Sequence, residues 1–190
     1  MAKESTMLAL GTAAPDFTLP DADGKLHRLS DFKAARGLVV AFISSHCPFV
    51  KHVRGEFARF AREYQARGVA AVAIMSNDLS VYPEDGPAGM KADVVSLGYA
   101  FPFLLDENQE VARAYQAACT PDFFLFDGNM KLVYRGQFDS TRPKGDAPAT
   151  GADLRAAADA LLAGKPPLAE QLPSIGCGIK WKAGNEPDYA

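Results

Sequence analysis

The sequence lacks several features that mark common classes of protein. Its 190 residues contain only three cysteines and three histidines, and no block of basic residues. The net charge of −3 provides no broad positive surface to offset phosphate repulsion, so we expect no nucleic-acid partner. The cysteines, at positions 47, 119 and 177, have no zinc-finger or zinc-ribbon spacing. We therefore expect neither a metal site nor a cofactor.

Long hydrophobic runs are also missing. Apolar stretches such as residues 38–43 have the length of a strand and are too short to span a membrane. Residues 1–10 lack the apolar core of a secretory signal. We therefore expect a cytoplasmic protein that does not contact membranes. In that compartment free thiols persist, and an odd number of cysteines favours redox or nucleophilic use over structural disulfides.

Strand and helix signals alternate along the chain. Residues 16–29 predict an N-terminal β-hairpin around an Asp-Ala-Asp-Gly turn. The apolar segments 37–43 and 69–75 predict strands that are buried on both faces. Between them, apolar residues at three- and four-residue steps predict a helix from Cys47 or Pro48 to just before Gly68.

Shorter signals complete the expected fold. They predict one helix that ends near residue 97 and two more over residues 107–117 and 151–163. They also predict strands at 101–105, 123–126 and 131–135. The Pro- and Gly-rich residues 164–190 predict an irregular C-terminal extension. This order predicts a single α/β domain over residues 1–190, with a mixed central sheet and helices on both of its faces.

Cys47 stands where a buried strand gives way to a helix. Pro48 suits the first helical turn, because its missing N–H would have no partner there. The unpaired N–H groups of a helix N-terminus stabilise a thiolate, and Lys51 adds positive charge about one turn later. His46 and His52 are candidate charge or proton donors. The pattern favours Cys47 as a nucleophile. The alternative is that Cys47 serves only as a small buried hydrophobic residue.

Several segments are similar to those of one superfamily. Residues 11–19, Gly-Thr-Ala-Ala-Pro-Asp-Phe-Thr-Leu, and 119–127, Cys-Thr-Pro-Asp-Phe-Phe-Leu-Phe-Asp, resemble the AhpC/TSA-related redoxin and peroxiredoxin branch of the thioredoxin superfamily. Three further motifs resemble a peroxiredoxin-like subgroup: His-Cys-Pro-Phe-Val-Lys-His at 46–52, Ser-Asn-Asp…Tyr-Pro-Glu-Asp at 76–85, and Pro-Ser-Ile-Gly-Cys…Ile-Lys-Trp-Lys at 173–182. The resemblance covers nearly the whole chain and implies a thioredoxin-like fold.

The resemblance also implies a substrate-binding region. It implies a cis peptide between Thr120 and Pro121 beside Cys47, where the backbone before the proline pairs with a mixed-disulfide partner. Pro48, Thr120 and Pro121 are therefore candidate substrate-binding residues. Asn77 is a further candidate, because loops at the carboxyl ends of strands line the ligand crevice in open α/β sheets. An ordinary solvated loop is the alternative for residues 76–87.

The partner of Cys47 is left open by the sequence. Val50 occupies the place of the second cysteine of thioredoxins, so it cannot resolve a mixed disulfide. Cys177 lies between two glycines as an approachable thiol, or it is a buried residue that anchors the tail. Cys119, two residues before Pro121, is the second candidate. An external thiol such as glutathione is the third.

These residues predict a thiol–disulfide oxidoreductase with Cys47 as nucleophile and Cys177 or Cys119 as resolving thiol. Its partner would be a protein or a low-molecular-weight thiol or disulfide, and the chain would be a monomer or a homodimer. One alternative is a peroxiredoxin-like thiol peroxidase that forms a sulfenic acid at Cys47. The other is a non-enzymatic thiol or metal sensor with Cys47, His46, His52 and Cys177 as candidate ligands.

Overall fold

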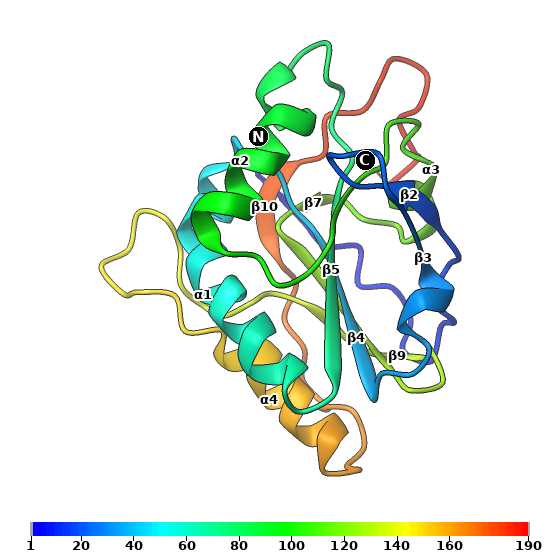
Figure 1. Cartoon of the computed structure of the whole chain (residues 1–190). Helices are drawn as coiled ribbons and strands as arrows, with labels where there is room; N and C mark the ends of the chain where they lie inside the picture. The colour runs from blue at the N-terminus through cyan, green and yellow to red at the C-terminus, as the bar shows by residue number, and fades with distance from the viewer. Residues whose placement is uncertain (1, 190) are drawn as a thin grey trace.

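A five-stranded mixed sheet, hereafter the central sheet, organises the protein (Figure 1). The structure is a computed structural model that describes residues 2–189. The strand order is β6-β5-β4-β8-β9. Strands β4, β5 and β6 are parallel, whereas β8 runs antiparallel to β4, and β9 runs antiparallel to β8. Their bounds are β4 Gly37–Phe42, β5 Val69–Met75, β6 Phe103–Leu105, β8 Asp122–Asp127 and β9 Leu132–Gly136.

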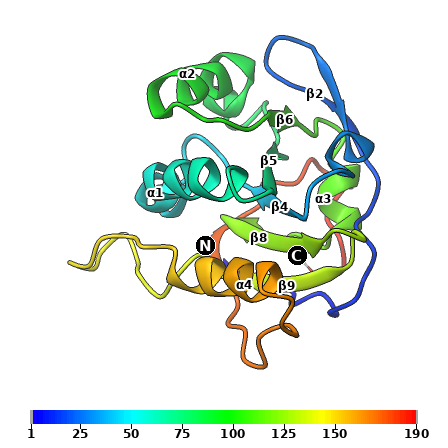
Figure 2. The same ribbon diagram turned by 60° about the horizontal axis from the view of Figure 1, so that its bottom comes forward.

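Helices cover both faces of the central sheet, as predicted. They are α1 Pro48–Gln65, α2 Pro87–Leu97, α3 Glu110–Ala114 and α4 Ala152–Leu162. Figure 2 shows α1, α2 and α4 on one side of the sheet and α3 on the other. Alternate residues of β4 therefore enter two cores: Val39 packs with the residues of α1 and α4, and Val40 packs with those of α3. Apolar residues on both faces explain why β4 and β5 read as continuous hydrophobic runs.

The N-terminal hairpin is present as predicted. Strands β2 Thr18–Pro20 and β3 Leu26–Arg28 pair antiparallel, and the short 3₁₀ helix η1 Leu29–Phe32 follows. The helix expected at 107–117 is shorter than predicted. Gln109 and Gln116 have φ angles of 63° and 52°, which interrupt the helical backbone on both sides of α3.

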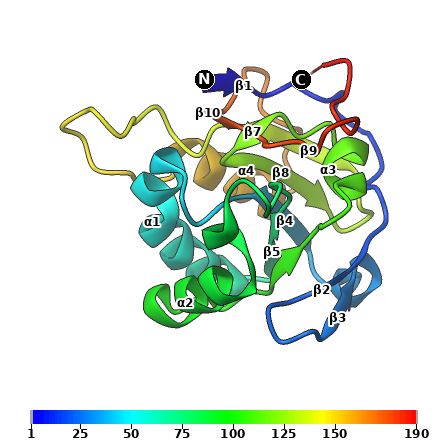
Figure 3. The same ribbon diagram turned by 90° about the horizontal axis from the view of Figure 1, so that it is seen from above.

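A second, three-stranded sheet corrects the expectation of a wholly irregular tail (Figure 3). This tail sheet has the order β1-β10-β7, with β1 Ala2–Glu4, β7 Cys119–Thr120 and β10 Ile175–Gly178. A Cβ atom on Gly176 would lie 2.1 Å from the Thr120 carbonyl oxygen, so only glycine permits this close approach. Pairing between such distant and short segments leaves no periodic signal in the sequence.

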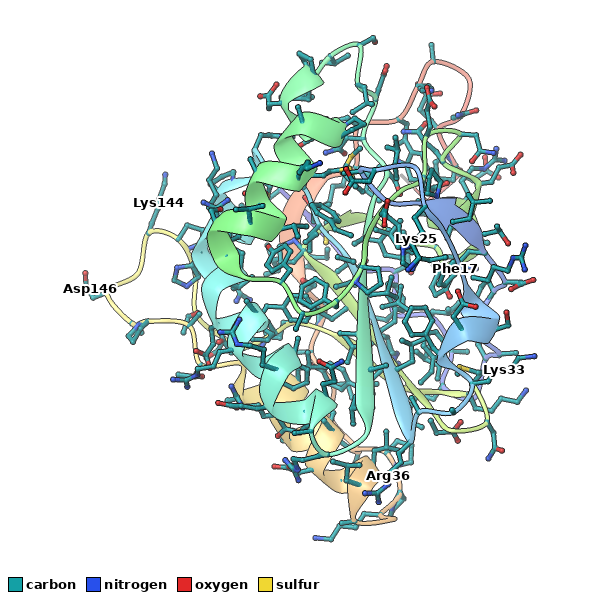
Figure 4. All side chains as sticks on the ribbon, in the orientation of Figure 1. Phe17, Lys25, Lys33, Arg36, Lys144 and Asp146 are labelled. Atoms are coloured by element: carbon teal, nitrogen blue, oxygen red, sulfur yellow. The ribbon has the colours of Figure 1, made fainter. Side chains whose placement is uncertain are left out.

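The loop between β9 and α4 is the most extended part of the surface. Figure 4 shows Lys144 and Asp146 at its tip, pointing away from the body of the protein. The 3₁₀ helix η2 Pro83–Asp85 interrupts the loop between β5 and α2. Among residues 2–189, no helix is both long enough and apolar enough to cross a membrane.

Candidate active site

Cys47 lies at the junction that the sequence predicts. It is the N-cap of α1, with φ −63° and ψ 124°, and Pro48 is the first helical residue. Its carbonyl accepts a 2.9 Å hydrogen bond from the Lys51 N–H, which closes the first turn. The Cys47 side chain has no exposed surface, and its thiol donates a 3.1 Å hydrogen bond to the Thr120 carbonyl. The nucleophile is therefore held against the segment that precedes Pro121.

The Thr120–Pro121 peptide is cis, as the resemblance implies. It joins β7 of the tail sheet to β8 of the central sheet. The hydroxyls of Ser44 and Thr120 lie 3.4 Å apart beside the nucleophile. The structure thus brings Cys47, Thr120 and Pro121 together, as expected.

Cys177 is the cysteine that the fold places against Cys47. Strands β10 and β7 pair antiparallel, with Cys177 opposite Thr120. Burial and a hydrogen bond with the Cys47 thiol raise the pKa of Cys177 to about 11. Both cysteines are unpaired in this structure, so the two thiols form a reduced pair.

Cys119 faces other partners. It lies opposite Gly178 in the same ladder, one residue before Thr120. Consecutive residues of a strand point to opposite faces, so the Cys119 and Thr120 side chains diverge. The Cys119 sulfur lies 3.6 Å from the Pro121 carbonyl oxygen and 3.9 Å from that of Ser174. Burial, reinforced by the Asp122 carboxylate, raises the pKa of this thiol well above its ordinary value.

Lys51 and Asn77 occupy contrasting positions. Lys51 is exposed, and within residues 2–189 its ammonium forms no hydrogen bond or ion pair. Asn77 is buried, with 3% of its surface exposed. Its amide donates to Asp85 at 2.8 Å, and its carbonyl oxygen accepts from the Lys180 N–H at 2.9 Å. The structure therefore places Asn77 as a link between a loop and the tail, and its contact with substrate stays a prediction.

Sequence reasoning missed the role of Asp85. This residue is 0% exposed, although the solvated-loop alternative would leave it on the surface. Its carboxylate lies 2.6 Å from Nδ1 of His46 and accepts a 3.1 Å hydrogen bond from the His46 N–H. The His46 ring is stacked on Tyr82, with a centroid distance of 4.0 Å. The Tyr-Pro-Glu-Asp motif is the one sequence signal that includes Asp85, and it does not reveal His46 as the partner of Asp85.

His52, the remaining polar candidate, forms its side-chain hydrogen bond away from Cys47. His52 lies 2.8 Å from the Thr141 hydroxyl, and both line a small cavity with Arg142 and Pro121. The guanidinium of Arg142 donates a hydrogen bond to the side chain of Gln137, so it is engaged within the protein. No group of three or more His, Cys, Asp or Glu residues in the described part of the chain is arranged to hold a metal ion. The metal-sensor alternative thus has no site to support it.

A reduced cysteine at a helix N-terminus, packed against a cis-proline segment of a mixed sheet, defines the thioredoxin-fold class of thiol redox proteins. The model of the AhpC/TSA family matches residues 10–135 of the sequence. The chain therefore belongs to the AhpC/TSA family, and the predicted resemblance is confirmed.

Known proteins agree with this assignment. A crystal structure of an uncharacterized conserved protein from Geobacillus kaustophilus is 55% identical, covers 96% of this chain and 97% of its own, and has a TM-score of 0.93. The thiol–disulfide oxidoreductase ResA of Geobacillus thermodenitrificans is 28% identical over 129 residues, 68% of this chain and 70% of ResA. Peroxidoxin BcpB from Mycobacterium tuberculosis, 20% identical over 82% of this chain and 96% of its own, shares the fold with a TM-score of 0.60. These comparisons confirm the predicted thioredoxin-like fold and the predicted thiol-dependent oxidoreductase class.

Proposed function

We propose that this thiol–disulfide oxidoreductase uses Cys47 as its nucleophile and Cys177 as its resolving thiol. The observation that carries the proposal is the position of Cys177 on β10, directly opposite Thr120, whose carbonyl accepts the hydrogen bond of the Cys47 thiol. Cys119, the other candidate, is one ladder position away and directs its sulfur to the Pro121 and Ser174 carbonyls. The geometry therefore favours Cys177 over Cys119.

The reaction proceeds in two exchanges. The Cys47 thiolate attacks one sulfur of a substrate disulfide, which forms a mixed disulfide and releases the other sulfur as a thiolate. The Cys177 thiolate then attacks the Cys47 sulfur, which releases the second substrate sulfur and forms a Cys47–Cys177 disulfide. Two protein thiols thus supply two electrons and two protons to the substrate. An external dithiol returns the protein to its reduced state.

The protonation of Cys177 supports this division of roles. Because burial and the Cys47 thiol raise the pKa of Cys177 to about 11, its thiolate is scarce at pH 7. A scarce thiolate is a poor first nucleophile, but it is sufficient for an intramolecular step at high effective concentration. We assign the first attack to Cys47, because it stands at the N-terminus of α1, where unpaired N–H groups stabilise a thiolate.

The partner is a protein or a low-molecular-weight thiol or disulfide. Cys47 is fully buried in the reduced protein, so the side chains around it must move before a protein disulfide reaches its sulfur. Transfer between Cys47 and Cys177 needs no such opening, because both cysteines lie at Thr120. We propose a cytoplasmic monomer or homodimer, and both properties stay predictions.

Non-reducing peptide mapping by mass spectrometry tests the assignment. One equivalent of oxidised dithiol added to the reduced protein is expected to yield a Cys47–Cys177 linkage. Cys119→Ser is the matched control and should form the same linkage, whereas Cys177→Ser should stop at the mixed disulfide on Cys47. A Cys47–Cys119 linkage, or a Cys47 that stays reduced, would overturn the proposal. A parallel sample with hydrogen peroxide tests the peroxidase alternative.

A further inference from the structure

A histidine–aspartate pair, in which the aspartate is fully buried, lies next to the nucleophile in the chain. His46 precedes Cys47 in the chain, and Asp85 reaches it from η2. The Asp85 carboxylate meets three donors: Nδ1 of His46 at 2.6 Å, the His46 N–H at 3.1 Å and the Asn77 amide at 2.8 Å. A fully buried carboxylate needs such partners, because burial without them is costly. Several hydrogen bonds therefore hold the His46–Asp85 pair in place.

Asp85 fixes which ring nitrogen of His46 carries a proton. Both oxygens of Asp85 accept hydrogen bonds from other N–H groups, so we assign the proton of the 2.6 Å contact to Nδ1 of His46. Nε2 is then the ring nitrogen that Asp85 does not hold. Within residues 2–189 this nitrogen forms no hydrogen bond, and the His46 side chain is 16% exposed. Nε2 is thus a ring atom without a hydrogen-bond partner in the described residues, on the residue that directly precedes Cys47.

The other two histidines are placed differently. His52 has its Nε2 2.8 Å from the Thr141 hydroxyl, which itself donates to Asp139. His27 is paired through Nε2 with Asp21, at 2.9 Å, in the N-terminal hairpin. Their Nε2 atoms have hydrogen-bond partners, whereas that of His46 has none among residues 2–189.

We propose that His46, oriented by Asp85, is the proton donor to the thiolate that leaves the substrate when Cys47 attacks. The proposal rests on the proposed function. As the Cys47–substrate S–S bond forms and the substrate S–S bond breaks, the departing sulfur takes the Nε2 proton of the His46 imidazolium. A neutral thiol departs, and the neutral imidazole regains a proton from water. Asp85 is a positioning residue, because it acts through the His46 ring and compensates the charge of the imidazolium.

The leaving group provides a direct test. Aliphatic thiols have a pKa of about 8.5 and leave more readily when protonated, whereas an aromatic thiolate of low pKa needs no proton. We would measure reduction of hydroxyethyl disulfide, reduction of dithionitrobenzoate and alkylation of Cys47 by iodoacetamide. His46→Gln is expected to slow the first reaction about ten- to hundredfold and to change the other two less than about twofold. Asp85→Asn is expected to show the same pattern with a smaller effect.

His27→Gln is the matched control, because it removes a His–Asp pair that is remote from Cys47. All three of its rates should equal those of the wild type, and urea unfolding of each variant reports its stability. Equal slowing of all three reactions in His46→Gln, or no slowing of any, would overturn the proton-donor role. If wild-type Cys47 is alkylated but reduces neither disulfide, the proposed function itself fails, and this inference fails with it.

Discussion

The central sheet and the tail sheet meet at the Thr120–Pro121 peptide, yet they are built in opposite ways. Strands β4, β5 and β8 of the central sheet have six or seven residues and are buried almost throughout. The strands of the tail sheet have two to four residues, and β1 is fully exposed. Two of the three cysteines nevertheless belong to the tail sheet. The comparison indicates that the central sheet supplies stability, whereas the tail sheet positions Cys177 opposite Thr120 beside Cys47.

The largest effect on stability is expected in the central sheet. Phe124 is 1% exposed and packs against Phe42 and Tyr115, with ring centroids 5.9 and 5.8 Å apart. Phe124→Ala should lower the free energy of unfolding by about 3–5 kcal/mol, because it leaves a cavity in the core. Urea denaturation measures this loss. The alkylation rate of Cys47 should stay unchanged, since Phe124 and Cys47 belong to cores on opposite faces of the sheet. A loss below about 1 kcal/mol would contradict the comparison.

A smaller effect on the free energy of unfolding is expected where the two sheets meet, and this effect depends on pH. Burial raises the pKa of Asp122 to about 7 from 3.8, although the Ser5 hydroxyl donates a 2.8 Å hydrogen bond to its carboxylate. Between these two values the folded chain holds a proton that the unfolded chain has lost. Its contribution to stability is therefore complete below pH 4 and declines as the pH rises towards 7.

Asp122→Asn should remove this decline, on the order of 2–4 kcal/mol, because an amide does not titrate. Urea unfolding of both proteins at pH 4.5 and pH 8 measures the difference. Parallel pH profiles for the two proteins would show that burial of Asp122 does not control stability.

The smallest effect on stability is expected in the tail sheet, together with a clear effect on chemistry. Gly176→Ala places a Cβ 2.1 Å from the Thr120 carbonyl oxygen, so β10 must move away from β7. We expect a loss of about 1–3 kcal/mol, as for other overpacked positions, and slower formation of the Cys47–Cys177 disulfide. Stopped-flow oxidation followed by thiol counting measures the rate.

Gly178→Ala is the matched substitution on the same strand. Its Cβ would meet the Lys3 side chain at 3.0 Å, and that flexible chain can move aside. Disulfide formation should therefore stay close to the wild-type rate. A larger effect from Gly178→Ala than from Gly176→Ala would show that contact with β1, rather than with β7, positions Cys177.

The sequence by itself determined the local features of this protein. Hydrophobic periodicity predicts β5 at its observed bounds and α1 to within a few residues, because the pattern of each element depends on its own side chains. The same local reasoning places Cys47 at the start of α1. The cis peptide before Pro121 was implied by the resemblance of residues 119–127 and is confirmed.

Only the tertiary structure decided which groups gather around Cys47. The choice between Cys177 and Cys119 depends on a ladder register between two very short strands, in which a shift of one residue exchanges the faces. The pairing of His46 with Asp85 joins two loops that follow different strands of the central sheet. Neither contact leaves a periodic trace in the sequence, because each is fixed by the packing of distant segments rather than by the conformational preferences of neighbouring residues.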